Sequence, residues 1–258
     1  MGVAVLESAA GGQVDSLTPK EVIELLSAQY GEVPQRPRRD PLEELVLGVL
    51  SQNTSDTNSE RAFAQLRRAL PSWQAVVEAP AAEVEEAIRP GGLAPTKSLR
   101  IKAMLAEILR RRGSFDLSFL REMPLDEAQA WLQSLPGVGP KTAAVVLLFS
   151  LGQPAFPVDT HVHRVLRRLG LAPAGASATQ AQSLWQARLA QEEVYAFHMY
   201  LIVHGRRTCV ARRPRCPECD LRRRCPSAAE FYPSLSADAC QSSYGDHSLP
   251  AGSIVAIL

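Results

Sequence analysis

The feature that most constrains the fold of this chain is a long series of helical patterns separated by Pro and Gly. Apolar side chains recur at helical spacing, and clusters such as Pro90-Gly91-Gly92 and Pro136-Gly137 separate neighbouring segments. No useful run of alternating apolar and polar residues predicts a β-strand. We therefore predict an all-α fold. The predicted helices cover 18–31, 42–51, 62–70, 81–88, 99–112, 125–134, 142–151, 160–169, 179–189 and 193–205.

The two ends of the chain lack this pattern. Residues 1–17 are small and polar without periodicity, so we expect a disordered leader. Residues 228–258 are rich in Ser and Ala and are expected to form a flexible tail. The first helix is expected to begin at Thr18-Pro19-Lys20-Glu21, because Thr suits the N-cap, Pro the first helical position and Glu the third.

Composition restricts the class of protein. The 258 residues are 46% hydrophobic and 21% charged, as in globular proteins with an ordinary core. No apolar run approaches the roughly 20 residues that a membrane helix needs. The first residues also lack the basic-then-apolar order of a signal peptide. We therefore expect a cytoplasmic protein without a membrane partner, and since nothing predicts an oligomer, we expect a monomer.

Four of the five cysteines fall within 17 residues, in the order Cys209-x6-Cys216-x2-Cys219-x5-Cys225. In a cytoplasmic protein this density favours metal binding over disulfides. Four thiolates hold either a tetrahedral zinc ion or a [4Fe–4S] cluster. Zinc sites usually pair two close knuckles, and here only Cys216 and Cys219 form one, so the spacing favours the cluster. Four buried reduced cysteines are the remaining alternative, and no role is predicted for Cys240.

Positive charge is concentrated around these cysteines, although the whole chain has a formal net charge of only +1. Residues 204–225 contain eight arginines and two acidic residues. Because a guanidinium pairs with phosphate oxygens in a bidentate fork, arginines on a stiff loop predict a polyanion site. Arg206, Arg212 and Arg213 are the predicted contacts. Alternatively, the arginines form a solvated basic face or neutralise an anionic cluster.

The segment Leu135-Pro136-Gly137-Val138-Gly139-Pro140-Lys141-Thr142-Ala143 predicts a hairpin between two helices. Two glycines allow positive φ and a close backbone approach, and Pro140 suits the first position of the second helix. The free N–H groups of such a hairpin and helix start bind an anion. We therefore predict a helix-hairpin-helix element whose Gly137, Val138 and Gly139 contact phosphates. An ordinary turn between helices is the alternative.

Lys141 and Asp159 are the candidate chemical groups. Lys141 follows the hairpin at a helix N-terminus, where the helix dipole disfavours an ammonium ion, so the lysine suits an amine nucleophile. A plain phosphate contact is the alternative. Asp159, in Val158-Asp159-Thr160-His161, precedes a predicted helix and suits an N-cap. A carboxylate fixed in this way is also well placed to face Lys141 across a cleft.

These features in this order resemble the helix-hairpin-helix DNA glycosylases, and within them the endonuclease III family. The similarity covers about residues 41–226. It implies a two-domain all-α fold around a DNA cleft, with a C-terminal iron–sulfur cluster loop. A six-helix barrel domain would span 43–153, with the helix-hairpin-helix at 125–151. A cluster domain would combine 18–42 with 154–227.

The resemblance also implies an activity. Such enzymes remove oxidised pyrimidines from double-stranded DNA in base excision repair and cleave the abasic site by β-elimination. Lys141 matches the nucleophile of the family, which forms a Schiff base, and Asp159 matches its acid. The four clustered cysteines match the ligands of its [4Fe–4S] cluster. DNA containing oxidised pyrimidines or abasic sites is the implied partner, which would associate the protein with the bacterial nucleoid.

The family fills the gap left by the extruded base with a polar side chain and an apolar wedge. The matching segments here are 51–56 and 91–94. The family pattern has a Gln three residues before the Asp that matches Asp56, but Asn53 stands there and the Gln is at Gln52. Either side chain therefore remains a candidate for the gap. Leu93 matches the wedge, and a leucine packed on the core is the alternative.

Three other functions remain in competition at this point. An adenine-specific mismatch glycosylase would need a Glu in the first barrel helix, and residues 45–50 contain no acid. A non-catalytic or monofunctional damage-binding protein could use the same scaffold, although binding alone would need neither Lys141 nor Asp159. A zinc-binding structural protein would explain only the cysteines.

Overall fold

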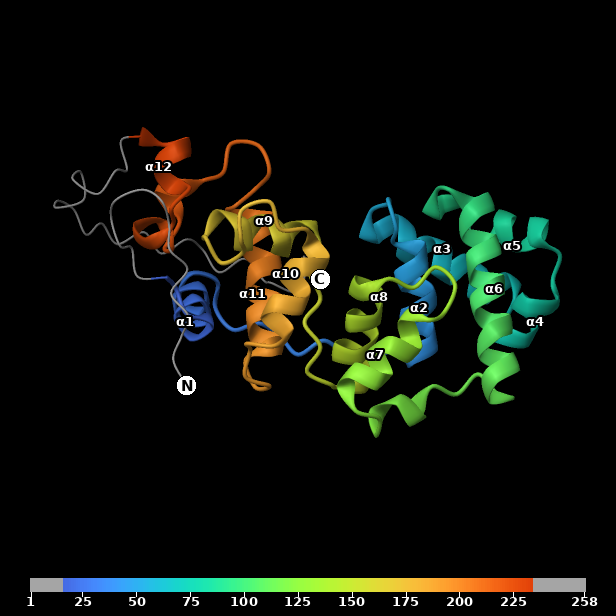
Figure 1. Cartoon of the computed structure of the whole chain (residues 1–258). Helices are drawn as coiled ribbons and strands as arrows, with labels where there is room; N and C mark the ends of the chain where they lie inside the picture. The colour runs from blue at the N-terminus through green and yellow to red at the C-terminus, as the bar shows by residue number, and fades with distance from the viewer. Residues whose placement is uncertain (1–15, 234–258) are drawn as a thin grey trace. The chain divides into compact units, whose positions relative to one another are not determined.

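The structure, a computed structural model, describes residues 16–233; residues 1–15 and 234–258, most of the predicted leader and tail, lie outside the described residues. Every regular element from 16 to 233 is helical, as predicted (Figure 1). None of these described helices combines the length and apolar character needed to span a membrane. The helices are α1 Pro19–Tyr30, α2 Pro41–Leu50, α3 Asp56–Ala69, α4 Trp73–Glu78, α5 Ala81–Ala87, α6 Ala94–Arg112, α7 Leu125–Gln133, α8 Pro140–Val145, α9 Thr160–Arg168, α10 Ala178–Gln186, α11 Val194–Arg207 and α12 Ala228–Phe231.

Three of the first six helices differ from the predicted pattern. α3 begins six residues before the predicted start at Ala62, because the Ser55 hydroxyl caps it and its first turn is polar. α6 begins at Ala94, directly after Leu93, which adopts the left-handed conformation. The short helix α4, capped by the hydroxyl of Ser72, was not predicted. A π-helix, η3 Val146–Leu151, continues α8.

The described chain divides into two compact units. The hairpin unit comprises residues 34–159 and 177–198, and the cysteine unit comprises the other described residues. These boundaries differ from the expected 43–153 barrel mainly by including 177–198. The reason is packing within the hairpin unit: Gln182 Nε2 in α10 donates to the Pro140 carbonyl (3.1 Å), and the Phe156 and Phe197 rings stack with centroids 5.6 Å apart.

Helix α2 forms the centre of the hairpin unit. It packs against α3, α6 and α8 (Figure 1), and most of its side chains are buried. This arrangement explains why residues 42–50 are apolar on nearly every face. Gly48 allows the close approach of α8, since a Cβ at this position would lie 2.7 Å from the Thr142 Cγ2 methyl.

Gly48→Ala is expected to lower the free energy of unfolding by about 1–3 kcal/mol, because the added methyl overlaps Thr142 in a closely packed core. Urea denaturation of the variant and the wild type measures the loss. Thr142→Ser removes the opposing methyl, so the double variant is expected to recover part of the stability. An unchanged midpoint for Gly48→Ala would contradict this account of the α2–α8 contact.

The cysteine unit extends slightly beyond the predicted boundaries at both ends. Leu17, expected in the leader, is 2% exposed, and Thr18 and Glu21 form the predicted capping box of α1. Arg224 Nη1 donates to Glu21 Oε1 at 2.7 Å, which joins α1 to the cysteine loop. The tail expected from residue 228 instead begins with helix α12, because Phe231 packs under the Arg168 guanidinium at 4.6 Å.

Candidate active site and cysteine loop

The predicted hairpin joins α7 to α8 through residues 134–139. Gly137 has φ +80°, and a Cβ at this position would lie 3.2 Å from Arg100 Cδ, so both its conformation and its surroundings favour glycine. Gly139 is the N-cap of α8, and Pro140 follows it. Because no described side chain caps α8, the first N–H groups of the helix are available to an anion.

Lys141 and Asp159 both lie in the hairpin unit and both influence the buried side chain of His198. Lys141 is an exposed residue in the first turn of α8, and the half-buried Asp159 directly precedes α9. Burial lowers the pKa of His198 to about 4, Asp159 raises this pKa, and Lys141 lowers it.

His198 is a site residue that sequence analysis missed. Its side chain is 2% exposed, and Nδ1 lies 3.0 Å from the Pro157 carbonyl oxygen. The rings of Phe149 and Phe156 contact it edge-on, with centroids 5.6 and 6.1 Å away. His198 thereby supports the segment that ends at Asp159. No local motif marks this residue, because its partners precede it by about 40–50 positions in the sequence.

Acidification is expected to destabilise the hairpin unit through His198. This histidine stays neutral in the folded state down to about pH 4, whereas it binds a proton near pH 6.5 when unfolded. Between these two pH values the unfolded state binds more protons than the folded state. The contribution of His198 to the free energy of unfolding is therefore greatest above pH 6.5 and decreases between pH 6.5 and 4, by about 2 kcal/mol at pH 5. Urea denaturation at several pH values measures this slope, which His198→Gln is expected to flatten. An equal slope in both proteins would contradict the assignment.

The structure distinguishes the two candidates for the DNA gap. Gln52 Nε2 donates to the Gly137 carbonyl (3.1 Å), and Gln52 Oε1 accepts from Arg100 (2.8 Å), so this side chain is held against the hairpin. Asn53 is exposed and has φ +54°. Leu93 has φ +50° and is 57% exposed, which excludes its packing on the core. Asp56 is the first residue of α3 and is exposed.

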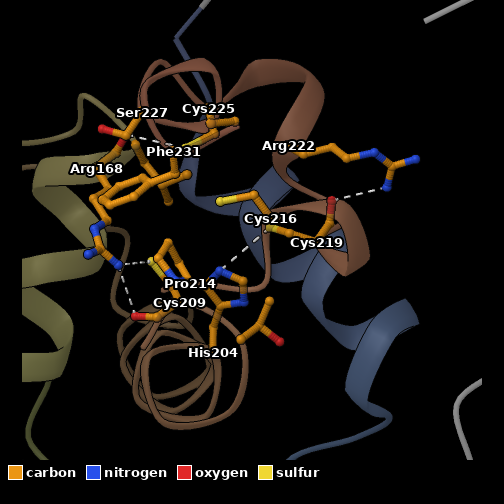
Figure 2. Close-up of a pocket in the computed structure, with 13 residues that line it drawn as sticks. Arg168, His204, Cys209, Pro214, Cys216, Cys219, Arg222, Cys225, Ser227 and Phe231 are labelled. Carbon is orange, nitrogen blue, oxygen red and sulfur yellow. Dashed lines mark hydrogen bonds between the residues drawn. The ribbon is translucent and has the colours of Figure 1, made fainter. Parts of the chain in front are cut away.

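All four predicted metal ligands line one pocket (Figure 2). Cys209, Cys216, Cys219 and Cys225 share this pocket with Arg168, His204, Pro214 and Phe231. Burial, with a smaller contribution from the neighbouring sulfurs, raises the pKa of Cys219 to about 12 and that of Cys225 to about 11. From residue 16 to 233, no three His, Cys, Asp or Glu side chains converge closely enough to hold a single metal ion.

Arg168 and His204 support the cysteine loop, and neither was predicted to do so. Arg168 Nη1 lies 3.3 Å from Cys209 Sγ (Figure 2), and it also donates to the Val210 carbonyl at 2.8 Å. His204 Nε2 lies 3.8 Å from Cys219 Sγ, and its Nδ1 lies 2.8 Å from the Tyr30 hydroxyl. The Arg168 guanidinium beside Cys209 suits a thiolate, because it compensates negative charge in a buried pocket.

The predicted arginine contacts lie at different places in the cysteine unit. Arg212 and Arg213 are exposed on the loop between Cys209 and Cys216, and Arg213 has φ +53°. Arg206 lies in the last turn of α11 and is half-buried. Not every arginine of this segment is available to a phosphate, because Arg224 forms an ion pair with Glu21.

Comparison with known proteins identifies the family. The model of the HhH-GPD superfamily of base excision DNA repair proteins matches residues 46–190, a segment that includes the hairpin, Lys141 and Asp159. This chain belongs to that superfamily. The predicted helix-hairpin-helix DNA glycosylase family and its all-α fold are thereby confirmed for the described residues.

Individual HhH-GPD relatives place the chain among endonuclease III-like proteins. Endonuclease III of Treponema pallidum is 38% identical over 181 residues, which cover 70% of this chain and 81% of that protein. An Arabidopsis thaliana protein of the DNA glycosylase type is 39% identical over 165 residues, and the match spans only 56% of its length. A solved structure of a trapped endonuclease III–DNA covalent intermediate superposes with a TM-score of 0.71 and 29% identity, covering 83% of this chain and 98% of that one.

Proposed function

We propose that this HhH-GPD protein is a bifunctional DNA glycosylase and AP lyase that removes oxidised pyrimidines from duplex DNA. The observation that carries the proposal is the position of Lys141, which is exposed in the first turn of α8 directly after the hairpin and lies in the same unit as Asp159. A protein that only bound damaged DNA would need neither an amine nor a fixed carboxylate at this position. The endonuclease III relatives and the likeness to a trapped covalent DNA intermediate support the same conclusion.

In the proposed reaction, the damaged nucleotide leaves the base stack and its C1′ meets the neutral amine of Lys141. The amine nitrogen bonds to C1′ while the glycosidic bond breaks, and the departing base takes the bonding electrons and a proton. Ionised Asp159 stabilises the positive charge that develops on the sugar. Ring opening gives a Schiff base, loss of a C2′ proton expels the 3′ phosphate, and water then releases Lys141.

The cysteines fit the proposed cofactor. Four soft sulfur donors line one pocket beside the Arg168 guanidinium, which suits an anionic iron–sulfur cluster. Cys209, Cys216, Cys219 and Cys225 would hold the [4Fe–4S] cluster. When bound, the cluster would cross-link the loop that carries Arg212 and Arg213. Those exposed arginines would then contact backbone phosphates from a loop that is already ordered.

A duplex with one thymine glycol and a label at the 5′ end tests the proposal. The expected product is a strand cut on the 3′ side of the lesion, without added alkali, that carries an unsaturated aldehyde. Duplexes with uracil or 8-oxoguanine at the same position serve as controls for the lesion class. Cleavage only after alkali would indicate a monofunctional glycosylase, and binding without any product would indicate a damage-binding protein.

A further inference from the structure

Lys97 in α6 is a buried lysine bonded to two backbone carbonyls. Its side chain is 1% exposed, and Nζ donates to the carbonyl oxygens of Leu50 at 2.6 Å and Gly91 at 2.8 Å. Burial lowers its pKa. A cation without water is costly to bury, so the ammonium depends on the two carbonyl acceptors that replace its water.

The two carbonyls end two different elements. Leu50 is the last residue of α2, and Gly91 ends the short helix η1 Arg89–Gly91. Carbonyls at helix ends lack partners within their own helix, and Lys97 supplies one to each. A Cβ on Gly91 would lie 3.2 Å from Ala62, so η1 also approaches α3 closely. Lys97 therefore fixes the spacing between the end of α2 and the end of η1.

Each of these ends leads directly into a residue with left-handed backbone. Asn53 follows Leu50 by three positions and has φ +54°, and Leu93 follows Gly91 by two positions and has φ +50°. Asparagine tolerates this conformation, but a leucine adopts it only where the surroundings enforce it. Leu93 is also an exposed leucine. The Lys97 ammonium is thus the group that connects the loops of these two exposed residues.

A second residue of α6 extends this support to the hairpin. Arg100 lies one turn after Lys97 and donates to Gln52 Oε1 at 2.8 Å, while Gln52 Nε2 donates to the Gly137 carbonyl at 3.1 Å. The aliphatic stem of Arg100 packs on Gly137. Helix α6 consequently connects three separate loops, those around Asn53, Leu93 and Gly137.

We propose that Lys97 is a positioning residue that holds the Asn53 and Leu93 loops at the separation needed to enter opened DNA. The proposal rests on the proposed function, since it assigns these loops to the gap left by the extruded nucleotide. A lysine reaches both carbonyls from one ammonium, so the loops stay ordered before DNA arrives. Pre-ordering strengthens binding to damaged DNA, because less freedom is lost on association.

The test compares Lys97→Met with Lys102→Met. Lys102 is a matched control: it lies on the same helix, and its Nζ donates to the carbonyls of Val76 at 3.1 Å, Val77 at 2.6 Å and Ala79, far along the chain from the loops. Affinities are measured for a duplex with a tetrahydrofuran abasic analogue and for the undamaged duplex. Thermal unfolding reports the stability of each variant.

Lys97→Met is expected to lose roughly 10- to 100-fold of its preference for the abasic analogue, because the loops lose their pre-ordering. Binding to the undamaged duplex should stay within about threefold of wild type. Borohydride trapping on single-stranded abasic DNA, which needs Lys141 but no wedge, should also persist. Lys102→Met is expected to lose stability but to keep the wild-type preference.

Two results would overturn the proposal: a wild-type preference in Lys97→Met, or an equal loss of preference in both variants. If Lys97→Met does not fold, Lys97→Arg decides, since it keeps the charge and donors but spaces the carbonyls differently. It is expected to lose at least about threefold of the preference, and full preference would refute the role. A wild type that neither prefers nor traps abasic DNA would instead refute the proposed function.

Discussion

Lys141→Gln is expected to reduce borohydride trapping on a duplex with one abasic site by roughly 1,000-fold or more. A glutamine amide nitrogen is not a nucleophile, so no Schiff base forms and nothing remains for borohydride to reduce. Binding to the abasic analogue should be nearly unchanged, because the hairpin N–H groups, Asn53 and Leu93 are all retained. The trapped complex is measured on a denaturing gel, and the affinity in a separate titration.

The structure provides controls for this experiment, because the chain has only three other lysines. Lys97 and Lys102 are bonded to backbone carbonyls. Lys20 is exposed and lies 4.0 Å from Glu24. Lys20→Gln should therefore trap as efficiently as wild type. If Lys141→Gln trapped normally while Lys20→Gln did not, the nucleophile would have been assigned to the wrong residue.

Local sequence patterns were enough to predict the hairpin and the cysteine site. Gly137 and Gly139 at a spacing of two, followed by Pro140, define a turn and a helix start whatever the rest of the fold does. The cysteines likewise lie within one short loop, so their convergence needs no distant element. Patterns of this kind depend on backbone conformation over a few residues.

The residues that the sequence did not predict depend on distant packing. His198 acts at the site only because α11 places it beside Pro157, and nothing near residue 198 marks it. Lys97 resembles any lysine of an amphipathic helix until the carbonyls of Leu50 and Gly91 are known to meet at its ammonium. For the same reason the sequence did not separate Gln52 from Asn53 as candidates for the DNA gap. The partners of the Gln52 side chain, Arg100 and Gly137, are distant in the sequence.

Cys219→Ser is expected to lower the iron content to below about a tenth of wild type and to destabilise the cysteine unit by about 5 kcal/mol or more. Cys219 is the one fully buried thiol of the described cysteines, and burial raises its pKa to about 12. A thiolate in this position therefore needs a compensating positive charge, which the iron ion that it ligates would supply. Serine fits the same space but is a poor ligand for iron.

Iron content, visible absorbance and thermal unfolding of the purified variant measure this effect. Cys240→Ser is the matched control, since the sequence assigns Cys240 no ligand role, and it should match wild type in all three measurements. Normal iron with normal stability in Cys219→Ser would refute the cluster assignment. Zinc in place of iron in the wild type would point to a structural zinc site.

Because Arg212 and Arg213 lie on the loop that the cysteines close, loss of the cluster should also weaken binding to undamaged DNA while Lys141 and Asp159 stay in place.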